Sequence, residues 1–258
     1  MQKYSEEGNV NIALLCEYDG TEFSGWQSQK NNKTVQEAIQ NAIFAVTNQK
    51  TMLYGCSRTD AGVHARGHVS NFISNCKIPV GKIPLALNSK LPGTISVKKA
   101  AIVEPGFNSR FNSKGKKYSY SIYNSPTRPA IERFSKYHLP AQLDINLMRE
   151  AAQKICGEHD FSCFMASKSE VKSTVRTVSS IEIIYNIPNV IIYVTGNGFL
   201  YNMVRIIAGT LCYVGLGKIE PEQIDDIIKS GDRRLSGKTL PPHGLCLEEV
   251  YFESDIFI

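Results

Sequence analysis

The chain lacks a hydrophobic run long enough to cross a membrane, since a spanning helix needs about 18 or more consecutive apolar residues. The best candidate, Met203 to Val214, is interrupted by Arg205 and Gly209. The N-terminus is polar, and the apolar stretch from Ile12 to Leu15 is too short for the core of a signal peptide. We therefore expect a cytoplasmic protein with no membrane partner.

Paired cysteine motifs are also missing. The seven cysteines are an odd number, and no two of them are spaced as Cys-x-x-Cys. Because this spacing is absent, the sequence supports neither a zinc site nor a thioredoxin-like redox motif. We expect most of the cysteines to be small buried apolar side chains. An apolar fraction of 42% with 21% charged residues is typical of a globular protein and excludes disordered and fibrous classes.

Positive charge is concentrated in one part of the chain. The sequence holds 29 basic and 24 acidic residues, a net charge of +5. The stretch from Lys98 to Lys117 contains six basic residues and one acidic residue, Glu104. Its net charge of +5 therefore equals the net charge of the whole chain. Charge alone leaves two interpretations open, a solvated basic loop or a surface that contacts phosphates.

Hydrophobic periodicity predicts an α+β fold in which strands alternate with helices. The expected strands are residues 11–18, 52–54, 68–73, 95–103, 117–123, 175–185, 190–195 and 247–252. The expected helices follow Thr34 and Asp144 or span residues 84–91, 200–214 and 221–230. Thr34 with Glu37 fits a capping box, in which both side chains satisfy free amides at a helix start. Because Pro105-Gly106 interrupts the pattern, we expect two α+β halves, residues 1–105 and 106–258.

The densest cluster of chemically useful residues is the segment GCSRTDAGVHARGH, residues 55–68. His64 and His68 could hold a metal if they lay on one helix, but glycines bracket them and no acidic ligand is nearby. Ser57 could be a nucleophile, although no GxSxG elbow surrounds it. Asp60 could be a carboxylate nucleophile or base that Arg58 keeps ionised. Composition alone makes a turn aspartate that caps backbone amides at least as plausible.

Five blocks of the chain share an order with one known family. They are Tyr18–Thr21 with Gly25–Gln29 and Thr34–Glu37; Gly55–His68; Phe107–Phe111 with Lys117–Tyr120; Gly157–Phe161; and Gly198–Leu211. These blocks resemble the motifs of the TruA family of tRNA pseudouridine synthases. One departure is Ser57, which stands where the family usually has glycine.

The resemblance implies an enzyme that isomerises uridine to pseudouridine in the anticodon stem-loop of tRNA, at tRNA positions 38–40, without a cofactor or a metal. It implies two ferredoxin-like halves that share a mixed, mostly antiparallel central sheet, with helices on one side and an RNA-binding cleft between the halves. It also implies a homodimer on which one tRNA bridges both subunits.

The resemblance assigns roles to individual residues. By motif position Asp60 is the catalytic carboxylate, which either attacks C1′ of the ribose or removes a C2′ proton. Arg58 holds the flipped base out of the stem, Tyr118 lies against that base, and Arg205 pairs with Asp60. Leu245 is similar to an apolar residue near the catalytic pocket.

The basic stretch gains a role in the same way, since phosphate contacts give a protein affinity for RNA and orient it. The substrate-binding residues expected there are Arg110, Lys114, Lys116 and Lys117. Two other classes remain as alternatives: a non-catalytic tRNA-binding protein or chaperone on the same scaffold, and a metal-dependent hydrolase using His64 and His68.

Overall fold

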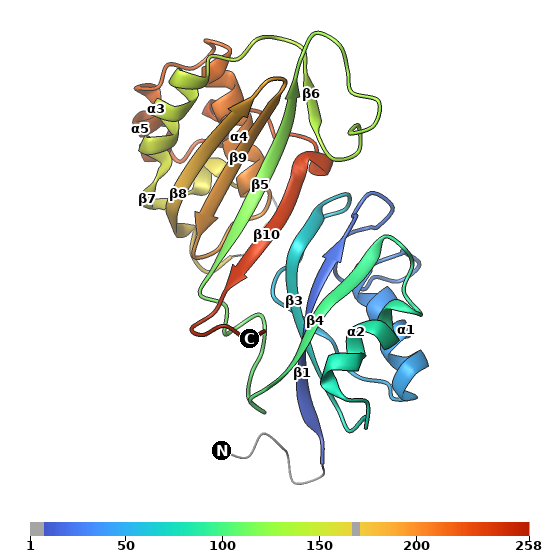
Figure 1. Cartoon of the computed structure of the whole chain (residues 1–258). Helices are drawn as coiled ribbons and strands as arrows, with labels where there is room; N and C mark the ends of the chain where they lie inside the picture. Colours follow the sequence, from blue (N-terminus) through green and yellow to red (C-terminus); the bar gives the residue numbers. More distant parts are fainter. Residues whose placement is uncertain (1–7, 167–170, 258) are drawn as a thin grey trace. The chain divides into compact units, whose positions relative to one another are not determined.

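The computed structural model describes residues 8–166 and 171–257 and divides into two compact units. Unit 1 runs to Lys114 and takes in the chain again from Leu247, and unit 2 is Gly115–Cys246 (Figure 1). The sequence places the boundary after residue 105 instead. The difference concerns the segment 106–114 and the last strand, both of which pack in unit 1.

Over the described residues, unit 1 is a sheet packed against two helices. Its elements are β1 (Val10–Tyr18), α1 (Val35–Thr47), β2 (Tyr54–Gly55), β3 (His64–Ser74), α2 (Ile83–Asn88), β4 (Ile95–Val103) and, from Leu247 on, β10 (Leu245–Tyr251). The strand order is β4-β1-β3-β10, and β2 also pairs with β3. The order β4-β1-β3-β2 over a β-α-β-β-α-β chain is that of a ferredoxin-like half, as expected.

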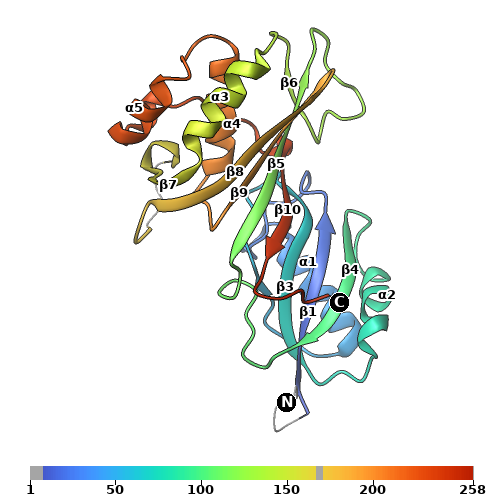
Figure 2. The same ribbon diagram turned by 60° about the vertical axis from the view of Figure 1, so that its left-hand side comes forward.

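Helices α1 and α2 cover one face of this sheet (Figure 2). Alternate residues of β1 point toward them, and Ile12 and Leu14 are almost fully buried. Ile39 and Ile43 of α1 lie one helical turn apart and are fully buried as well. Each such side chain contributes about 1.5–3 kcal/mol of hydrophobic stabilisation, so this face forms the core of unit 1.

The segment after β4 is attached to unit 1 by two buried asparagines. Asn11 Nδ2 donates to the carbonyl oxygens of Glu104, at 3.1 Å, and of Phe107, at 2.8 Å. Asn71 Nδ2 donates to Asn11 Oδ1, and Asn71 Oδ1 accepts from the amide of Ser109. Buried amide groups need such partners. The chain beyond Pro105-Gly106 therefore continues to belong to unit 1.

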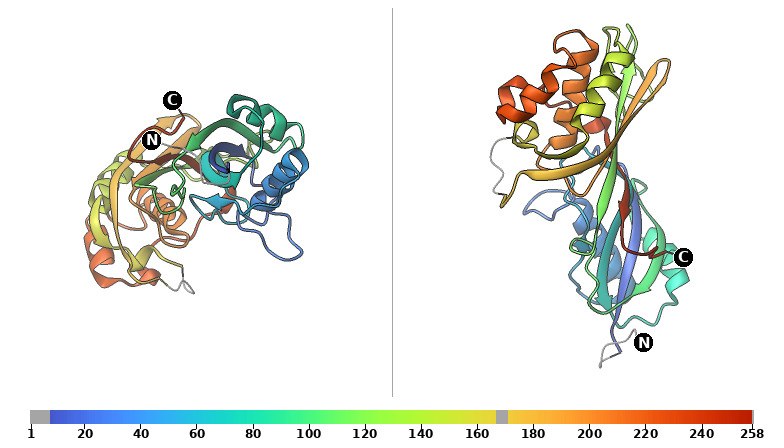
Figure 3. Two further views of the ribbon diagram at one scale, coloured as in Figure 1. Left: turned by 90° about the horizontal axis from the view of Figure 1, so that it is seen from below. Right: turned by 90° about the vertical axis from the view of Figure 1, so that its left-hand side faces the viewer.

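Unit 2 contains, in its described residues, further strands and three helices. Its elements are β5 (Gly115–Asn124), β6 (Tyr137–Leu139), α3 (Ile145–Ile155), β7 (Gly157–Asp160), β8 (Val175–Asn186), β9 (Asn189–Gly196), α4 (Met203–Gly215) and α5 (Gln223–Ser230). The strands follow the order β5-β9-β8-β7, all antiparallel, while β6 runs parallel to β5. Helices α3 and α4 lie against one face of this sheet (Figure 3). The expected α+β class with mixed, mostly antiparallel pairing is confirmed.

The two predicted helix caps have different outcomes. Asp144 accepts hydrogen bonds from the amides of Asn146 and Leu147, so the cap of α3 is confirmed. Thr34 occupies the N-cap position of α1, but its hydroxyl makes no capping bond. The capping box is therefore wrong. The amides of Val35 and Gln36, the first two of the helix, donate to the carbonyl oxygens of Gly25 and Trp26.

Several boundaries differ from the sequence expectation. Helix α4 begins at Met203 because Asn202 before it has a left-handed backbone, with φ of 61°. Helix α5 begins two residues after Pro221 and ends, as expected, at a left-handed Gly231. The short strands β6 and β7 were not predicted. In the part of the chain that the structure describes, there are four 3-10 turns: Val80–Lys82, Ser162–Phe164, Arg233–Leu235 and Pro242–Gly244.

Across the described ranges, no helix combines the length and apolar character that a membrane crossing requires.

Candidate functional site

The Arg-Thr-Asp segment lies in the loop that joins β2 to β3 in unit 1. The carbonyl oxygen of Thr59 accepts from the amide of Trp26 at 3.0 Å. The carbonyl oxygen of Asp60 accepts from the amide of Val63 at 3.1 Å, which closes a turn over Gly62, with φ of 77°. The backbone on both sides of the Asp60 Cα is thereby held in place.

Side chains around the loop support it from within unit 1. The hydroxyls of Tyr18 and Thr59 share a buried hydrogen bond of 2.8 Å. The ring nitrogen Nε2 of His68 lies 3.1 Å from the carbonyl oxygen of Ser57, and since a carbonyl only accepts, Nε2 is the donor. Thr59 thus faces the core, whereas Arg58 is exposed and Asp60 is half-buried.

The indole of Trp26 stacks on the imidazole of His68. Their ring centroids are 3.7 Å apart and the planes are inclined by 22°. The ring of Tyr18 adjoins both at a tilted angle. Trp26 is also confined by Gly55, where a Cβ atom would lie 2.5 Å from the indole. The three rings form a buried cluster behind the loop.

Gln36 links the Trp26 segment to the start of α1. Its Oε1 accepts from Gln27 Nε2 and from the amide of Ser28, and its Nε2 donates to the carbonyl oxygen of Leu53 at 2.8 Å. Within the motif Thr34–Glu37, Gln36 is therefore the residue that makes the tertiary contacts. It holds the residues after Trp26 against the segment that leads into the Arg-Thr-Asp loop.

The histidines do not have the helical arrangement that the metal hypothesis required. His64 and His68 both lie on β3, where four residues span about 13 Å, too far for both to ligate one ion. His64 Nδ1 accepts from the amide of Gly20 instead. Among residues 8–166 and 171–257, no cluster of three or more metal-ligating side chains occurs. Ser57 also lies between two strands, so its loop is not the strand-to-helix elbow of a serine nucleophile.

Tyr118 is a buried residue of β5 in unit 2, with 7% of its surface exposed. Its register partner is Val194 on β9. The ring meets Phe199 edge-on, with centroids 5.4 Å apart and planes at 90°. This contact fixes the plane of the tyrosine ring, which suits a residue that presents a face to a base.

Arg205 lies on α4, and its guanidinium is oriented by neighbours within unit 2. Nε donates to the carbonyl oxygen of Leu240 at 2.7 Å, and an Nη atom donates to Oδ1 of Asn202 at 2.6 Å. The left-handed backbone of Asn202 places that amide beside the arginine. Leu245 is buried and opens β10 directly after the turn Pro242–Gly244.

The four expected phosphate contacts differ in their surroundings. Arg110 and Lys114 are exposed in unit 1, and the Arg110 guanidinium lies 5.6 Å from the centroid of Phe111. Lys116 and Lys117 are half-buried on β5, and Lys117 Nζ lies over Tyr193 at 4.5 Å. All four lie in one short stretch of chain, with cationic groups directed at aromatic rings in two cases.

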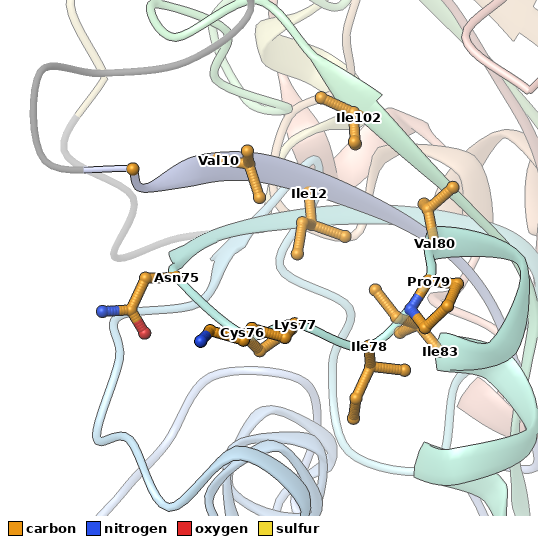
Figure 4. A pocket seen from close by; sticks show the side chains of 11 residues that line it. Val10, Ile12, Asn75, Cys76, Lys77, Ile78, Pro79, Val80, Ile83 and Ile102 are labelled. Carbon is orange, nitrogen blue, oxygen red and sulfur yellow. The ribbon is translucent and has the colours of Figure 1, made fainter.

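Unit 1 also contains a cavity of about 540 Å³ between the start of β1 and the approach to α2 (Figure 4). Its lining is mainly apolar and includes Ile12, Ile78, Val80 and Ile102. None of the expected site residues belongs to this lining. The cavity is therefore a feature separate from the Arg-Thr-Asp loop.

The fold and the loop define an α+β protein that presents an arginine and a carboxylate on a loop braced from behind. The model of the family described as tRNA pseudouridine synthase matches residues 15–112 and 151–253. The chain belongs to this family. It is accordingly an enzyme, an isomerase that acts on tRNA, as the sequence motifs predicted.

Individual relatives agree with this assignment. The chain is 48% identical over 242 residues to the tRNA pseudouridine synthase A of Caldicellulosiruptor bescii and 48% identical to that of Clostridium acetobutylicum, in each case over 94% of this chain and 99% of the relative. Among solved structures, a chain of the archaeal box H/ACA sRNP Nop10-Cbf5 complex has a TM-score of 0.40 at 12% identity, over 80% of this chain and 44% of that one.

The residues that support the loop, above all His68 and Thr59, were not predicted from the sequence. One signal was present. His68 lies on the same face of a strand as the buried Phe72, and a polar side chain on a buried face needs a hydrogen-bond partner. The position of His68 therefore predicts a partner but does not identify it.

Proposed function

We propose that the enzyme converts uridine to pseudouridine in the anticodon stem-loop of tRNA, at positions 38–40, with Asp60 as the catalytic carboxylate. The observation that carries this proposal is the bracing of the Arg-Thr-Asp loop. The carbonyl oxygens of Ser57, Thr59 and Asp60 each accept a hydrogen bond, so the Asp60 side chain is carried on a fixed backbone. Preorganisation of this kind is what a reacting group requires.

The chemistry needs an ionised carboxylate. In one route Asp60 attacks C1′ of the ribose, the C1′–N1 bond breaks, and its electron pair leaves on the uracil. The base turns, C5 bonds to C1′ as the carboxylate departs, and the C5 proton passes to water. In the other route Asp60 removes a C2′ proton to give a glycal. Both routes release the C5 proton.

The base must leave the stem before Asp60 can reach C1′. Arg58 is the residue proposed to hold it out, because its exposed guanidinium is planar and can stack or contact phosphate. Tyr118, with its ring plane fixed by Phe199, is proposed to lie against the extruded base. Arg205 is proposed to pair with Asp60, and Leu245 to line the pocket.

The substrate is proposed to be held through its phosphates by Arg110, Lys114, Lys116 and Lys117. We also propose a homodimer with one tRNA across both subunits, acting in the cytoplasm without a cofactor. These expectations follow from the family resemblance, as does the cleft between the halves.

The deciding experiment uses tRNA that carries uridine tritiated at C5. The wild-type enzyme should release tritium to water, and Asp60→Asn should release none while still binding tRNA, because the amide is neither a nucleophile nor a base. Asp226→Asn, an exposed change on α5, is the matched control and should behave as wild type. Release by Asp60→Asn at the wild-type rate would remove Asp60 from this role and leave a non-catalytic binding function for the loop.

A further inference from the structure

His68 is a fully buried histidine that the proposed chemistry does not use. It lies on β3, eight residues beyond Asp60, with its side chain directed into unit 1. Burying an imidazole without a hydrogen bond is unfavourable. Its Nε2 donates to the carbonyl oxygen of Ser57 at 3.1 Å, because a carbonyl oxygen can only accept.

The stacked pair holds the backbone on both sides of Arg58. His68 binds the carbonyl oxygen of Ser57, and the backbone amide of Trp26 binds the carbonyl oxygen of Thr59. The two rings stack at 3.7 Å, so the side chain that binds Ser57 packs against the residue whose amide binds Thr59. The loop is thus fixed at two alternate carbonyl groups.

The space around the pair is closed. The indole of Trp26 packs directly against Gly55. A Cβ atom on residue 55 would lie 2.5 Å from the ring, so only a hydrogen atom fits there. The Tyr18 hydroxyl holds the side chain of Thr59 toward the same cluster. The backbone conformation at Asp60 is therefore coupled to the position of the His68 ring.

We propose that His68 is a positioning residue for the isomerisation: its hydrogen bond to Ser57, held by stacking on Trp26, sets the conformation of the loop that carries Arg58 and Asp60. The proposal rests on the function proposed above for Asp60. His68 touches no reacting atom and acts only through the loop.

Two substitutions separate the donor from the ring. His68→Phe keeps an aromatic ring for Trp26 and removes the donor. His68→Gln places an amide nitrogen four bonds from Cα, the same number as Nε2 of histidine, and keeps the donor without the ring. We expect His68→Phe to lower kcat for tritium release by about 10- to 100-fold, with KM for tRNA within about threefold of wild type. His68→Gln should recover kcat to within about fivefold of wild type.

Phe72→Leu is the matched control, because Phe72 is buried on the same face of β3, four residues further along. It should lower thermal stability while leaving kcat near the wild-type value. Wild-type kcat in His68→Phe would overturn the proposal. So would a fall in kcat in Phe72→Leu that equals that of His68→Phe at the same loss of stability, since the effect would then be general destabilisation. A wild-type kcat in His68→Phe alongside an inactive Asp60→Asn overturns the positioning role alone, whereas an active Asp60→Asn overturns the proposed function.

Discussion

Gly25 and Thr59 approach so closely that a Cβ atom on Gly25 would lie 2.6 Å from the carbonyl oxygen of Thr59. Gly25 also has φ of 92°, a conformation that L-residues with side chains rarely adopt. The next amide, of Trp26, donates to that same carbonyl oxygen. Because residue 25 is a glycine, the backbone before Trp26 can lie directly against the candidate catalytic loop.

Gly25→Ala should therefore affect both stability and catalysis. The strained φ and the contact with Thr59 predict a loss of about 1–3 kcal/mol in the free energy of unfolding. Because the loop must shift to relieve the contact, kcat for tritium release should fall as well. Urea denaturation and single-turnover assays measure the two effects.

Gly217→Ala is the control for backbone conformation alone. Gly217 has φ of 66°, but nothing lies within 4 Å of the position of its Cβ. Gly217→Ala should lower the free energy of unfolding by about 1 kcal/mol and leave kcat unchanged. An unchanged kcat in Gly25→Ala as well would show that the contact with Thr59 does not matter for the loop.

Arg205→Ala should shift the pH dependence of the reaction. A nearby guanidinium favours the ionised form of a carboxylate, so its loss favours the protonated, inactive form. If Arg205 pairs with Asp60, the acid limb of the plot of kcat against pH should move to higher pH. Arg149→Ala is the control, because Arg149 also donates to a backbone carbonyl in unit 2, that of Ile183. An acid limb that stays in place in Arg205→Ala would contradict the pairing.

Lys114→Ala and Lys116→Ala should weaken tRNA binding and make it less sensitive to salt. Each phosphate contact that is lost should reduce the slope of log K against log salt by about 0.7–0.9. Filter binding at several salt concentrations gives this slope. Lys90→Ala, an exposed change in unit 1, should leave it unaltered. Equal slopes in all three variants would place the RNA elsewhere.

Asp144 and Thr34 both precede helices, yet their removal should have opposite consequences. Asp144→Ala loses hydrogen bonds to two helix amides and should cost about 1 kcal/mol. Thr34→Val should be neutral or stabilising, because the buried Thr34 hydroxyl finds no hydrogen-bond partner among the described residues. Thermal unfolding compares the two, and a loss of stability in Thr34→Val similar to that of Asp144→Ala would show that the hydroxyl does cap α1.

The sequence predicted the elements that its own periodicity encodes and missed those that depend on distant partners. Strand β4 was placed at its observed bounds, Ile95–Val103, because a run rich in Ile and Val is a local signal. Strands β6 and β7 are only three and four residues long and exist through pairing with β5 and β8. The Thr34 cap failed for a similar reason, since Gly25 and Trp26 replace it across a long loop.

In the candidate site, too, residues in a local motif were predicted and contacts between distant segments were not. Asp60 and Arg58 stand in a recognisable motif, so sequence reasoning found them. The bond from His68 to Ser57 and the stack on Trp26 join segments far apart in the chain, and no local pattern specifies either contact. The boundary between the units was missed because the side chains of Asn11 and Asn71, from the first two long strands, fix the segment after β4.

The return of the chain to unit 1 at Leu247 sets an order of events on the ribosome. Strand β10 lies next to β3, with Arg66 paired to Glu248, yet β10 is synthesised only after all of unit 2. While translation proceeds, nascent β3 exposes an unoccupied hydrogen-bonding edge, the kind of surface on which stray strands add. Unit 2 is continuous in sequence, so it can fold before the residues from Leu247 onward have been synthesised. The N-terminal half of the polypeptide is thus made first but acquires its last strand only when the rest has emerged.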